Sequence, residues 1–348
     1  MRAIRFDGKA VQVAGDQPDP VAGPGEALVR PALVGVGEAD LLVVRGAVNF
    51  TGVLGHEFVG TIVSSNPGPS ASREPLAAGT KVVGSTVIPC RACDLCKRGL
   101  AMHCRARTVP GLLGRGGVMA DLFTMPLASL HAVPAGVRDE DAVLALPLAS
   151  AIHASSIVRL EGKSYITVIG DGPAALIAGQ VMARQNASVR VLSERAATSA
   201  LCEKWGLKHR LISEVGRRQD QDVVVECTRT PEGLDLALRL VRPRGKVLLM
   251  GPPVPIVSKA NAAGGAAVGG VGGAGGAGLS ESLSMAAAYE IEILGASMGN
   301  IPAALDALAK KNFDFAGLVT KRARFADAVK ALAAAASGDQ IKVVLDAA

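Results

Sequence analysis

The chain has 348 residues, of which 49% are hydrophobic and 20% are charged. This composition is typical of a folded globular protein, and the length is sufficient for two domains. Aromatic residues make up only 3% of the chain, which argues against a stacking surface for single-stranded nucleic acid. The formal net charge is +6, but the Lys and Arg residues are scattered and form no basic run. The charge pattern therefore does not predict a nucleic-acid partner.

The chain start and one uncharged segment bear on localisation. Residues 1–13 alternate apolar and polar side chains as a first strand does, and they lack the apolar core of a signal peptide. Residues 260–280 carry no charge, but they are mostly Gly and Ala, which are too weakly apolar for membrane insertion. We interpret about 259–280 as a flexible low-complexity insert and expect a cytoplasmic protein without a membrane partner.

Two patterns of predicted secondary structure follow one another along the chain. The first part predicts short strands between Gly and Pro clusters, at Ala27–Arg30, Phe58–Val63 and Lys81–Val83. From Ser164 onward, apolar strands alternate with helical segments. The strands are expected at Tyr165–Ile169, Ser188–Leu192, Asp222–Glu226, Lys246–Met250 and Glu290–Leu294, and the helices at 173–184, Thr198–Trp205 and Glu232–Val241.

This alternation predicts an α/β fold with a doubly wound parallel sheet. After it, a helical Ala/Leu pattern begins at Ile301, and a strand is expected at Ile341–Leu345. We therefore expect two domains, with the second inserted between parts of the first. The first takes residues 1–150 and 298–348, and the second takes residues 151–297.

Four of the six cysteines lie close together, in a lobe at about 88–106. They are Cys90, Cys93, Cys96 and Cys104, separated by gaps of two, two and seven residues. This dense spacing is typical of a closed tetrahedral zinc site made of four thiolates, which is structural. A pair of disulfides is the alternative, but a cytosolic location disfavours it. We expect one structural zinc per chain.

A glycine-rich loop follows the strand Tyr165–Ile169 and opens a helix. It reads Gly170-Asp171-Gly172-Pro173-Ala174-Ala175 and fits the G-x-G-x-x-G/A fingerprint of dinucleotide binding. The first glycine makes the tight turn, and the second lets a pyrophosphate approach the backbone at the helix N-terminus. The expected cofactor-binding positions here are Gly170, Gly172, Pro173 and Ala174. A glycine-rich turn without a ligand is the alternative.

The end of the next strand bears on the choice between NAD and NADP. An acidic residue there would hold the ribose hydroxyls of NAD. The chain has Ser193 at this position and Arg195 close by, a pair that favours the 2′-phosphate of NADP. Glu194 favours NAD if its side chain turns inward. We expect Ser193 and Arg195 to bind the cofactor, which is NADP or NAD.

Taken together, these motifs resemble the medium-chain, zinc-containing alcohol dehydrogenase superfamily, and most closely its polyol- and threonine-dehydrogenase-like branch. The segments GHEFVG at 55–60, the four-cysteine lobe, PLASAIHA at 147–154 and GDGPAA at 170–175 come in the family's order. The resemblance implies a GroES-like catalytic domain interrupted by a Rossmann domain. It also implies an enzyme that oxidises alcohols or reduces carbonyls with a nicotinamide cofactor.

The chain departs from the family where a catalytic zinc would bind. Members usually have a zinc-binding Cys and a proton-relaying Thr in a segment where this chain has Gly37 and Ala39. A further ligand position before Pro-Leu holds Leu146. His56 therefore lacks its usual partners, and one imidazole beside one carboxylate does not hold zinc tightly.

Three readings of the remaining pair His56-Glu57 stay open. His56 can act through hydrogen bonds without a metal, or the pair can be structural. As a third option, Glu38 could complete a metal site with His56 and Glu57. The candidate catalytic residues are His56, Glu57 and Glu38.

Three functional hypotheses follow. The first is an NAD(P)-dependent oxidoreductase acting on a small alcohol, carbonyl or activated alkene. The second is a catalytically silent, cofactor-binding homologue, and the third is an interaction protein that uses its Gly/Ala insert. Because relatives often pair through the last strands of the Rossmann domain, a homodimer or homotetramer is expected.

Overall fold

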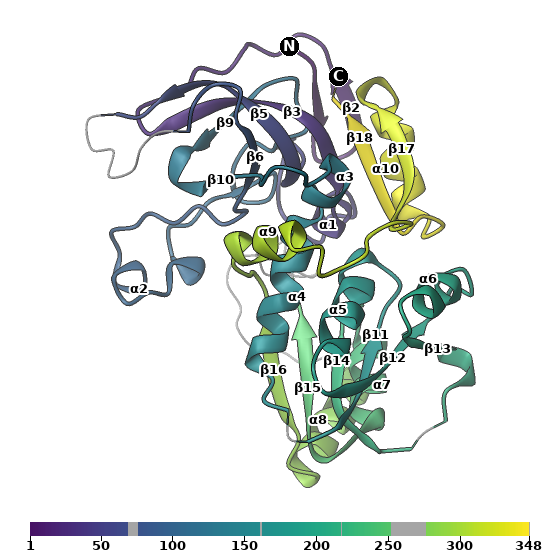
Figure 1. The fold of residues 1–348 in the computed structure, drawn as a ribbon. Coiled ribbons are helices and arrows are strands. Elements are labelled where there is room, and N and C mark those ends of the chain that lie inside the picture. The colour runs from purple at the N-terminus through teal and green to yellow at the C-terminus, as the bar shows by residue number, and fades with distance from the viewer. Residues whose placement is uncertain (69–75, 161, 217, 252–275, 348) are drawn as a thin grey trace. The chain divides into compact units, whose positions relative to one another are not determined.

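The computed structural model describes residues 1–68, 76–160, 162–216, 218–251 and 276–347. These residues form two compact units (Figure 1). The first unit is made of residues 1–146 and 301–347, and the second of residues 147–251 and 276–300. Each unit has its own sheet and its own buried apolar core.

The first unit is built on a large, mostly antiparallel sheet. Its strand order is β10-β6-β5-β3-β18-β17, and β9 also pairs with β3. The long strand β3 (Glu26–Val36) is central, because it pairs with β5 on one side and with β18 on the other. The remaining strands are β5 (Glu57–Asn66), β6 (Lys81–Gly84), β9 (Phe123–Pro126), β10 (Leu130–Ala132), β17 (Val319–Arg324) and β18 (Lys342–Asp346).

The chain start forms a hairpin and not the single strand expected for residues 1–13. β1 (Ala3–Phe6) pairs antiparallel with β2 (Val11–Ala14). The turn between them is held by the Asp7 side chain, which accepts hydrogen bonds from the backbone N–H groups of Lys9 and Ala10. This Asp turn competes with a straight strand, which the alternating pattern alone does not reveal.

The first unit also contains short strands and helices around the sheet. The strands are β4 (Gly52–Val53), β7 (Val109–Pro110) and β8 (Gly114–Arg115). The helices are α1 (Glu38–Val44), α2 (Asp94–Lys97), α3 (Asp139–Ala142), α9 (Ile301–Ala309) and α10 (Ala328–Ala336). Helix α1 starts directly after β3, so the end of that strand and the first turn of α1 share one site.

The second unit confirms the predicted doubly wound parallel sheet. Its order is β13-β12-β11-β14-β15-β16, and every neighbouring pair is parallel. The strands are β11 (Ser164–Ile169), β12 (Ala187–Ser193), β13 (Lys208–Leu211), β14 (Gln221–Glu226), β15 (Val241–Met250) and β16 (Glu292–Ala296). The strand expected at Glu290–Leu294 begins two residues later.

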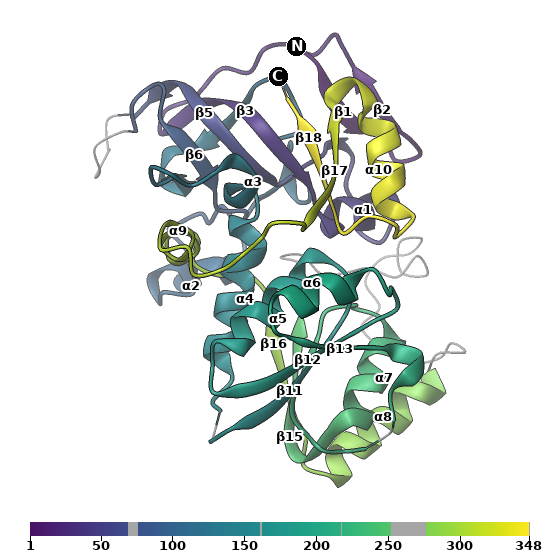
Figure 2. The same ribbon diagram turned by 45° about the vertical axis from the view of Figure 1, so that its right-hand side comes forward.

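Helices cover both faces of this sheet (Figure 2). In chain order, the strands are added outward from β11 to β13 on one side of the sheet and from β14 to β16 on the other. Right-handed crossovers therefore place α5 and α6 on one face and α7 and α8 on the opposite face. The helices of this unit are α4 (Ala145–Ile157), α5 (Pro173–Ala183), α6 (Thr198–Lys204), α7 (Pro231–Leu240) and α8 (Gly276–Ala288).

Most of the predicted Gly/Ala insert, 259–280, falls on residues 252–275, outside the described residues. Its last five residues belong to helix α8. None of the helices in the described part of the chain is long and apolar enough to cross a membrane.

Candidate active site

The register of three strands in the first unit brings two distant charged residues together. Gly35 of β3 lies opposite Glu57 of β5 on one side and Val344 of β18 on the other. The Lys342 ammonium group reaches across the end of β3, pairs with the Glu57 carboxylate and donates a hydrogen bond to the Val36 carbonyl (2.9 Å). Both charged side chains are buried, with exposed fractions of 3% and 9%.

This ion pair depends on a residue without a side chain at position 35. A Cβ at Gly35 would lie 2.7 Å from Oε2 of Glu57 and 3.0 Å from Cε of Lys342. Both distances are shorter than ordinary van der Waals contacts, so a larger residue would push the two groups apart. Because Gly35 has no side chain, the Glu57 carboxylate and the Lys342 ammonium can meet beside β3 at this position.

The other side of Glu57 faces His56, which is oriented by Asp40. The Asp40 side chain is fully buried and accepts hydrogen bonds from the backbone N–H groups of Gly37 (2.8 Å) and Gly55 (3.0 Å). Its Oδ1 also lies 3.3 Å from Nδ1 of His56. Nδ1 is thus the protonated nitrogen that donates to Asp40, and Nε2 lies 3.8 Å from Oε1 of Glu57.

The environment of His56 favours its charged form. Burial alone would lower the pKa of the imidazole, but the charge and hydrogen bond of Asp40 and the charge of Glu57 outweigh burial. The pKa of His56 is therefore raised above its ordinary value. A buried imidazolium with Nδ1 bound to a carboxylate can offer the Nε2 proton to an acceptor.

Gly37 and Leu146, the two positions where the sequence predicts missing metal ligands, have no metal-binding atom in their side chains. Gly37 lies against His56, and a Cβ there would come within 2.6 Å of the imidazole Cε1 and 2.9 Å of Oε1 of Glu57. Leu146 is a buried side chain of α4, and Glu38 is exposed at the start of α1. Among the described residues, the only set of three or more His, Cys, Asp or Glu side chains placed to hold a metal is the cysteine cluster.

The four clustered cysteines have the geometry of a zinc site. Their sulfur atoms all lie within 4.8 Å of one another, and three of the separations are 3.4, 3.6 and 3.8 Å. Tetrahedral zinc with Zn–S bonds of about 2.3 Å implies sulfur separations of about 3.8 Å. Backbone N–H groups of Ala92 and Cys93 lower the pKa of Cys90 to about 6, whereas burial and the neighbouring thiols raise the pKa of Cys96 to about 12. The cluster of Cys90, Cys93, Cys96 and Cys104 therefore fits a structural zinc.

The glycine-rich loop of the second unit has space for a ligand. Gly170 adopts a φ of +138°, which permits the tight turn from β11 into α5, and a Cβ there would contact Ala175 at 3.1 Å. A Cβ at Gly172 would meet no atom within 4 Å. Gly172 is the N-cap of α5, Pro173 begins the helix, and no side chain caps its N–H groups. These features fit a pyrophosphate at the helix N-terminus.

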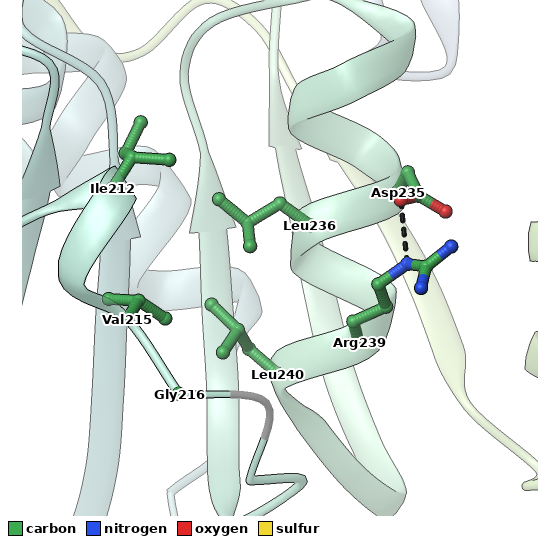
Figure 3. A pocket seen from close by; sticks show the side chains of 7 residues that line it. All are labelled: Ile212, Val215, Gly216, Asp235, Leu236, Arg239 and Leu240. Carbon is green, nitrogen blue, oxygen red and sulfur yellow. Dashed lines mark hydrogen bonds and ion pairs between the residues drawn. The ribbon is translucent and has the colours of Figure 1, made fainter.

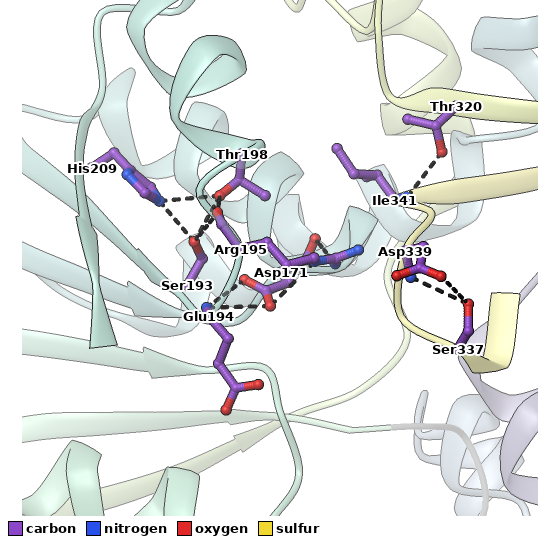
Figure 4. A network of polar contacts seen from close by, with 10 residues as sticks. All are labelled: Asp171, Ser193, Glu194, Arg195, Thr198, His209, Thr320, Ser337, Asp339 and Ile341. Carbon is purple, nitrogen blue, oxygen red and sulfur yellow. Dashed lines mark hydrogen bonds and ion pairs between the residues drawn. The ribbon is translucent and has the colours of Figure 1, made fainter. Parts of the chain in front are cut away.

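At the end of β12, Ser193 lies in a buried hydrogen-bond network (Figure 4). Its Oγ lies 2.7 Å from both Oγ1 of Thr198 and Nε2 of His209, and 2.9 Å from the Arg195 carbonyl. The Ser193 side chain is fully buried, so its hydroxyl fixes the loop at 193–198. Burial lowers the pKa of His209, although Asp171 and Glu214 oppose the shift, and this favours the neutral imidazole.

A separate hollow in the second unit is shown in Figure 3. It is lined by apolar side chains of the segment after β13 and by the second half of α7, where Arg239 pairs with Asp235 (2.7 Å). The lining residues are Ile212, Val215, Gly216, Asp235, Leu236, Arg239 and Leu240. It shares no residue with the candidate catalytic or cofactor positions.

Comparisons with known proteins place the chain in a family. The family model of the alcohol dehydrogenase GroES-like domain matches residues 23–135 of the sequence. The erythritol/L-threitol dehydrogenase of Mycolicibacterium smegmatis is 31% identical over 251 residues, which cover 63% of this chain and 68% of that protein. The L-threonine 3-dehydrogenase of Streptomyces avermitilis is 26% identical over 95% of this chain and 94% of its own. The chain therefore belongs to the zinc-containing medium-chain alcohol dehydrogenase superfamily.

Solved structures agree on the fold. An alcohol dehydrogenase of Thermus sp. ATN1 matches with a TM-score of 0.81 at 24% identity, over 99% of both chains. A protein of Sinorhizobium meliloti, described as a zinc-binding dehydrogenase and bound to NADP, matches with a TM-score of 0.79 at 21% identity, over 99% of this chain and 98% of its own. The predicted GroES-like and Rossmann fold class is confirmed.

The family assignment also settles the broad activity. The protein is an NAD(P)-dependent oxidoreductase of the alcohol dehydrogenase type, and its relatives do not favour the catalytically silent alternative. Zinc and a nicotinamide cofactor belong to this class, and the four-cysteine cluster fits the structural metal.

Sequence reasoning missed two residues of the buried site, Asp40 and Lys342. Asp40 ends the segment GVGEAD, and its position three residues after Gly37 at the start of a helix was an available signal. Lys342 had no such signal. Its partner Glu57 is 285 positions away, and only the pairing of β18 with β3 brings them together.

Proposed function

We propose that the protein uses NADPH or NADH to reduce small carbonyl compounds or conjugated alkenes, and that His56 polarises the substrate in place of a metal. The observation that carries the proposal is the orientation of His56 by buried Asp40, which leaves Nε2 as a proton donor. The relatives named for erythritol, L-threitol and L-threonine support a small, polar substrate.

Each residue of the buried site has a separate proposed role in the reduction. A reduced nicotinamide, when bound, would supply the hydride for the electron-poor carbon of the substrate. His56 donates its Nε2 proton to the oxygen where negative charge develops, and Asp40 stabilises the imidazolium beforehand. Glu57, which pairs with Lys342, also lies 3.8 Å from Nε2 of His56 and helps to keep the imidazole ring in place.

Reduction is favoured over oxidation of simple alcohols for a physical reason. An unactivated alcohol must lose a proton as it loses a hydride, and a metal usually assists this step by several kcal/mol. Gly37, Ala39 and Leu146 provide neither ligands nor a hydroxyl relay. Reduction of an electron-poor carbonyl or conjugated alkene needs less stabilisation of charge by the protein, because the developing negative charge is delocalised.

The proposed cofactor site uses Gly170, Gly172, Pro173 and Ala174 around the pyrophosphate. The open space beside Gly172 supports this position. At the end of β12, Arg195 would contact the 2′-phosphate of NADP, while Ser193 holds the loop through its buried hydroxyl.

The test is a panel of carbonyls, conjugated alkenes and primary alcohols, assayed with both cofactors before and after treatment with a chelator. We expect chelator-resistant reduction, poor alcohol oxidation and a loss of kcat in His56→Gln. The variant Gly37→Cys with Leu146→Glu tests whether restored ligands create zinc-dependent alcohol oxidation. Wild-type protein that oxidises simple alcohols in a chelator-sensitive way would contradict the proposal and bring Glu38 back as a ligand.

We also propose a cytoplasmic homodimer or homotetramer, with domains 1–150 plus 298–348 and 151–297. The four clustered cysteines form no disulfide, which is typical of a reducing compartment. In the described part of the sheet, β16 is an edge strand, and its Ile293 is 37% exposed, which supports self-association there. Light scattering of the purified protein measures the assembly state.

A further inference from the structure

The side chain of Asp171, in the middle of the glycine-rich loop, turns toward the end of β12 (Figure 4). Its Oδ1 accepts a hydrogen bond from the backbone N–H of Glu194 at 3.0 Å. Its Oδ2 lies 3.3 Å from Nε of Arg195, and the Arg195 Nη2 donates to the Asp171 carbonyl at 2.8 Å. One carboxylate thus accepts a hydrogen bond from a backbone N–H group and forms an ion pair with a guanidinium group.

This donor set is that of an anion site. A guanidinium group and a backbone N–H that converge on one point bind carboxylates and phosphates by short, charge-assisted hydrogen bonds. Here the chain's own carboxylate fills the site. Arg195, which is the proposed ligand of the 2′-phosphate, is therefore already paired with an internal anion.

The surrounding loop limits how the site can rearrange. The Ser193 and Thr198 hydroxyls both hydrogen-bond to the Arg195 carbonyl, at 2.9 and 2.7 Å, and both residues are fully buried. The backbone of Arg195 is thereby held while its side chain remains partly exposed. The Glu194 carboxylate points away from the network, so it does not share the cation (Figure 4).

We propose that Asp171 is a specificity-determining residue that competes with the 2′-phosphate of NADP for Arg195 and the Glu194 N–H. This rests on the proposed role of Arg195 in cofactor binding. A 2′-phosphate carries close to two negative charges, so it must displace the Asp171 carboxylate or bind beside it against repulsion. The neutral 2′-hydroxyl of NAD meets no such conflict, so Asp171 shifts selectivity toward NAD.

The experiment measures dissociation constants of NADPH and NADH by fluorescence titration at one stated salt concentration. Wild type is compared with Asp171→Asn, which keeps an oxygen acceptor for the Glu194 N–H, and with Asp171→Ser as a second variant. We expect both to bind NADPH about tenfold more tightly and NADH within about threefold of wild type, because each variant removes one negative charge beside the 2′-phosphate. Thermal unfolding checks that each variant is folded.

Two controls separate this inference from the proposed function. Glu203→Gln removes an equal charge from an exposed position on α6 and should leave both constants unchanged. Arg195→Gln is made alone, where it should weaken NADPH binding, and in the Asp171→Asn background, where it should remove the gained NADPH affinity.

The outcomes distinguish the ideas. If Arg195→Gln weakens NADPH binding but the Asp171 variants bind NADPH no better than wild type, competition by Asp171 is wrong while the role of Arg195 stands. If Arg195→Gln has no effect on NADPH, the proposed role of Arg195 fails as well. An equal loss of both cofactors in the Asp171 variants would mean that Asp171 only supports the loop.

Discussion

Lys342 and Glu57 form an ion pair in which each side chain is more than nine-tenths covered. Removing one partner leaves the other charge buried without compensation. We therefore expect Lys342→Met to reduce the free energy of unfolding by about 3–5 kcal/mol. Urea denaturation measures the change, and Glu57→Gln in the same chain should recover part of it.

Lys310→Met is the matched control, because the pair that Lys310 forms with Asp306 is exposed at the C-terminal end of α9. Its loss should cost about 0–1 kcal/mol. Equal effects of the two Lys→Met changes would show that water reaches the Lys342 site and that the ion pair does not organise it.

The raised pKa of His56 gives a pH dependence with a defined sign. A group whose pKa is higher in the folded state stabilises fully at low pH, and this stabilisation is lost as pH rises through the folded pKa. The proton donor is lost over the same range. We expect kcat/KM for reduction to be flat at low pH and to fall about tenfold per pH unit above the folded pKa.

The control for this pH profile is His56→Gln, which keeps a hydrogen-bonding side chain but does not titrate. Its residual activity should lack the descending limb. A wild-type profile that rises with pH would contradict the assignment of His56 as an acid and would indicate a base in its place.

At the scale of elements, the cysteine lobe contains a short helix that adds no buried side chain to a core. Helix α2 has four residues, and none of them is buried. We expect Cys96→Ser to lose the single zinc and to lower the thermal midpoint, because structural zinc contributes folding free energy. Elemental analysis checks the stoichiometry of one zinc per chain in wild type. Two equivalents would contradict it and point to a second metal near His56.

Elements also differ in how well the sequence predicts them. β11 and β14 were predicted within one residue at either end, because each is an apolar run between polar turns. The four-residue strand β13, with the sequence KHRL, was not predicted as an element, since it alternates exposed and half-buried side chains. Its place beside β12 matters to the cofactor site because it supplies His209 to the Ser193 network.

At the scale of the whole molecule, sites built from one short stretch of sequence could be predicted, and sites that depend on the pairing of distant strands could not. The cysteine spacing and the glycine loop lie within short stretches, so the sequence predicts both sites residue by residue. The network of Asp40, His56, Glu57 and Lys342 joins α1, β5 and β18, and no local pattern encodes the register that unites them. The same holds for Asp171 and Arg195, which meet only because β11 and β12 are neighbours.

The empty position at Gly35 sets a rule for how this protein can change over evolutionary time. A side chain at 35 and the ion pair of 57 and 342 cannot share the same space, since a Cβ would lie 2.7 Å from the carboxylate. Point mutations at these three positions are therefore coupled, although positions 35 and 342 lie far apart in the sequence. In an alignment of relatives, Glu at 57 with Lys at 342 should accompany Gly at 35. Lineages with a bulkier residue at 35 should have lost one of the two charges first.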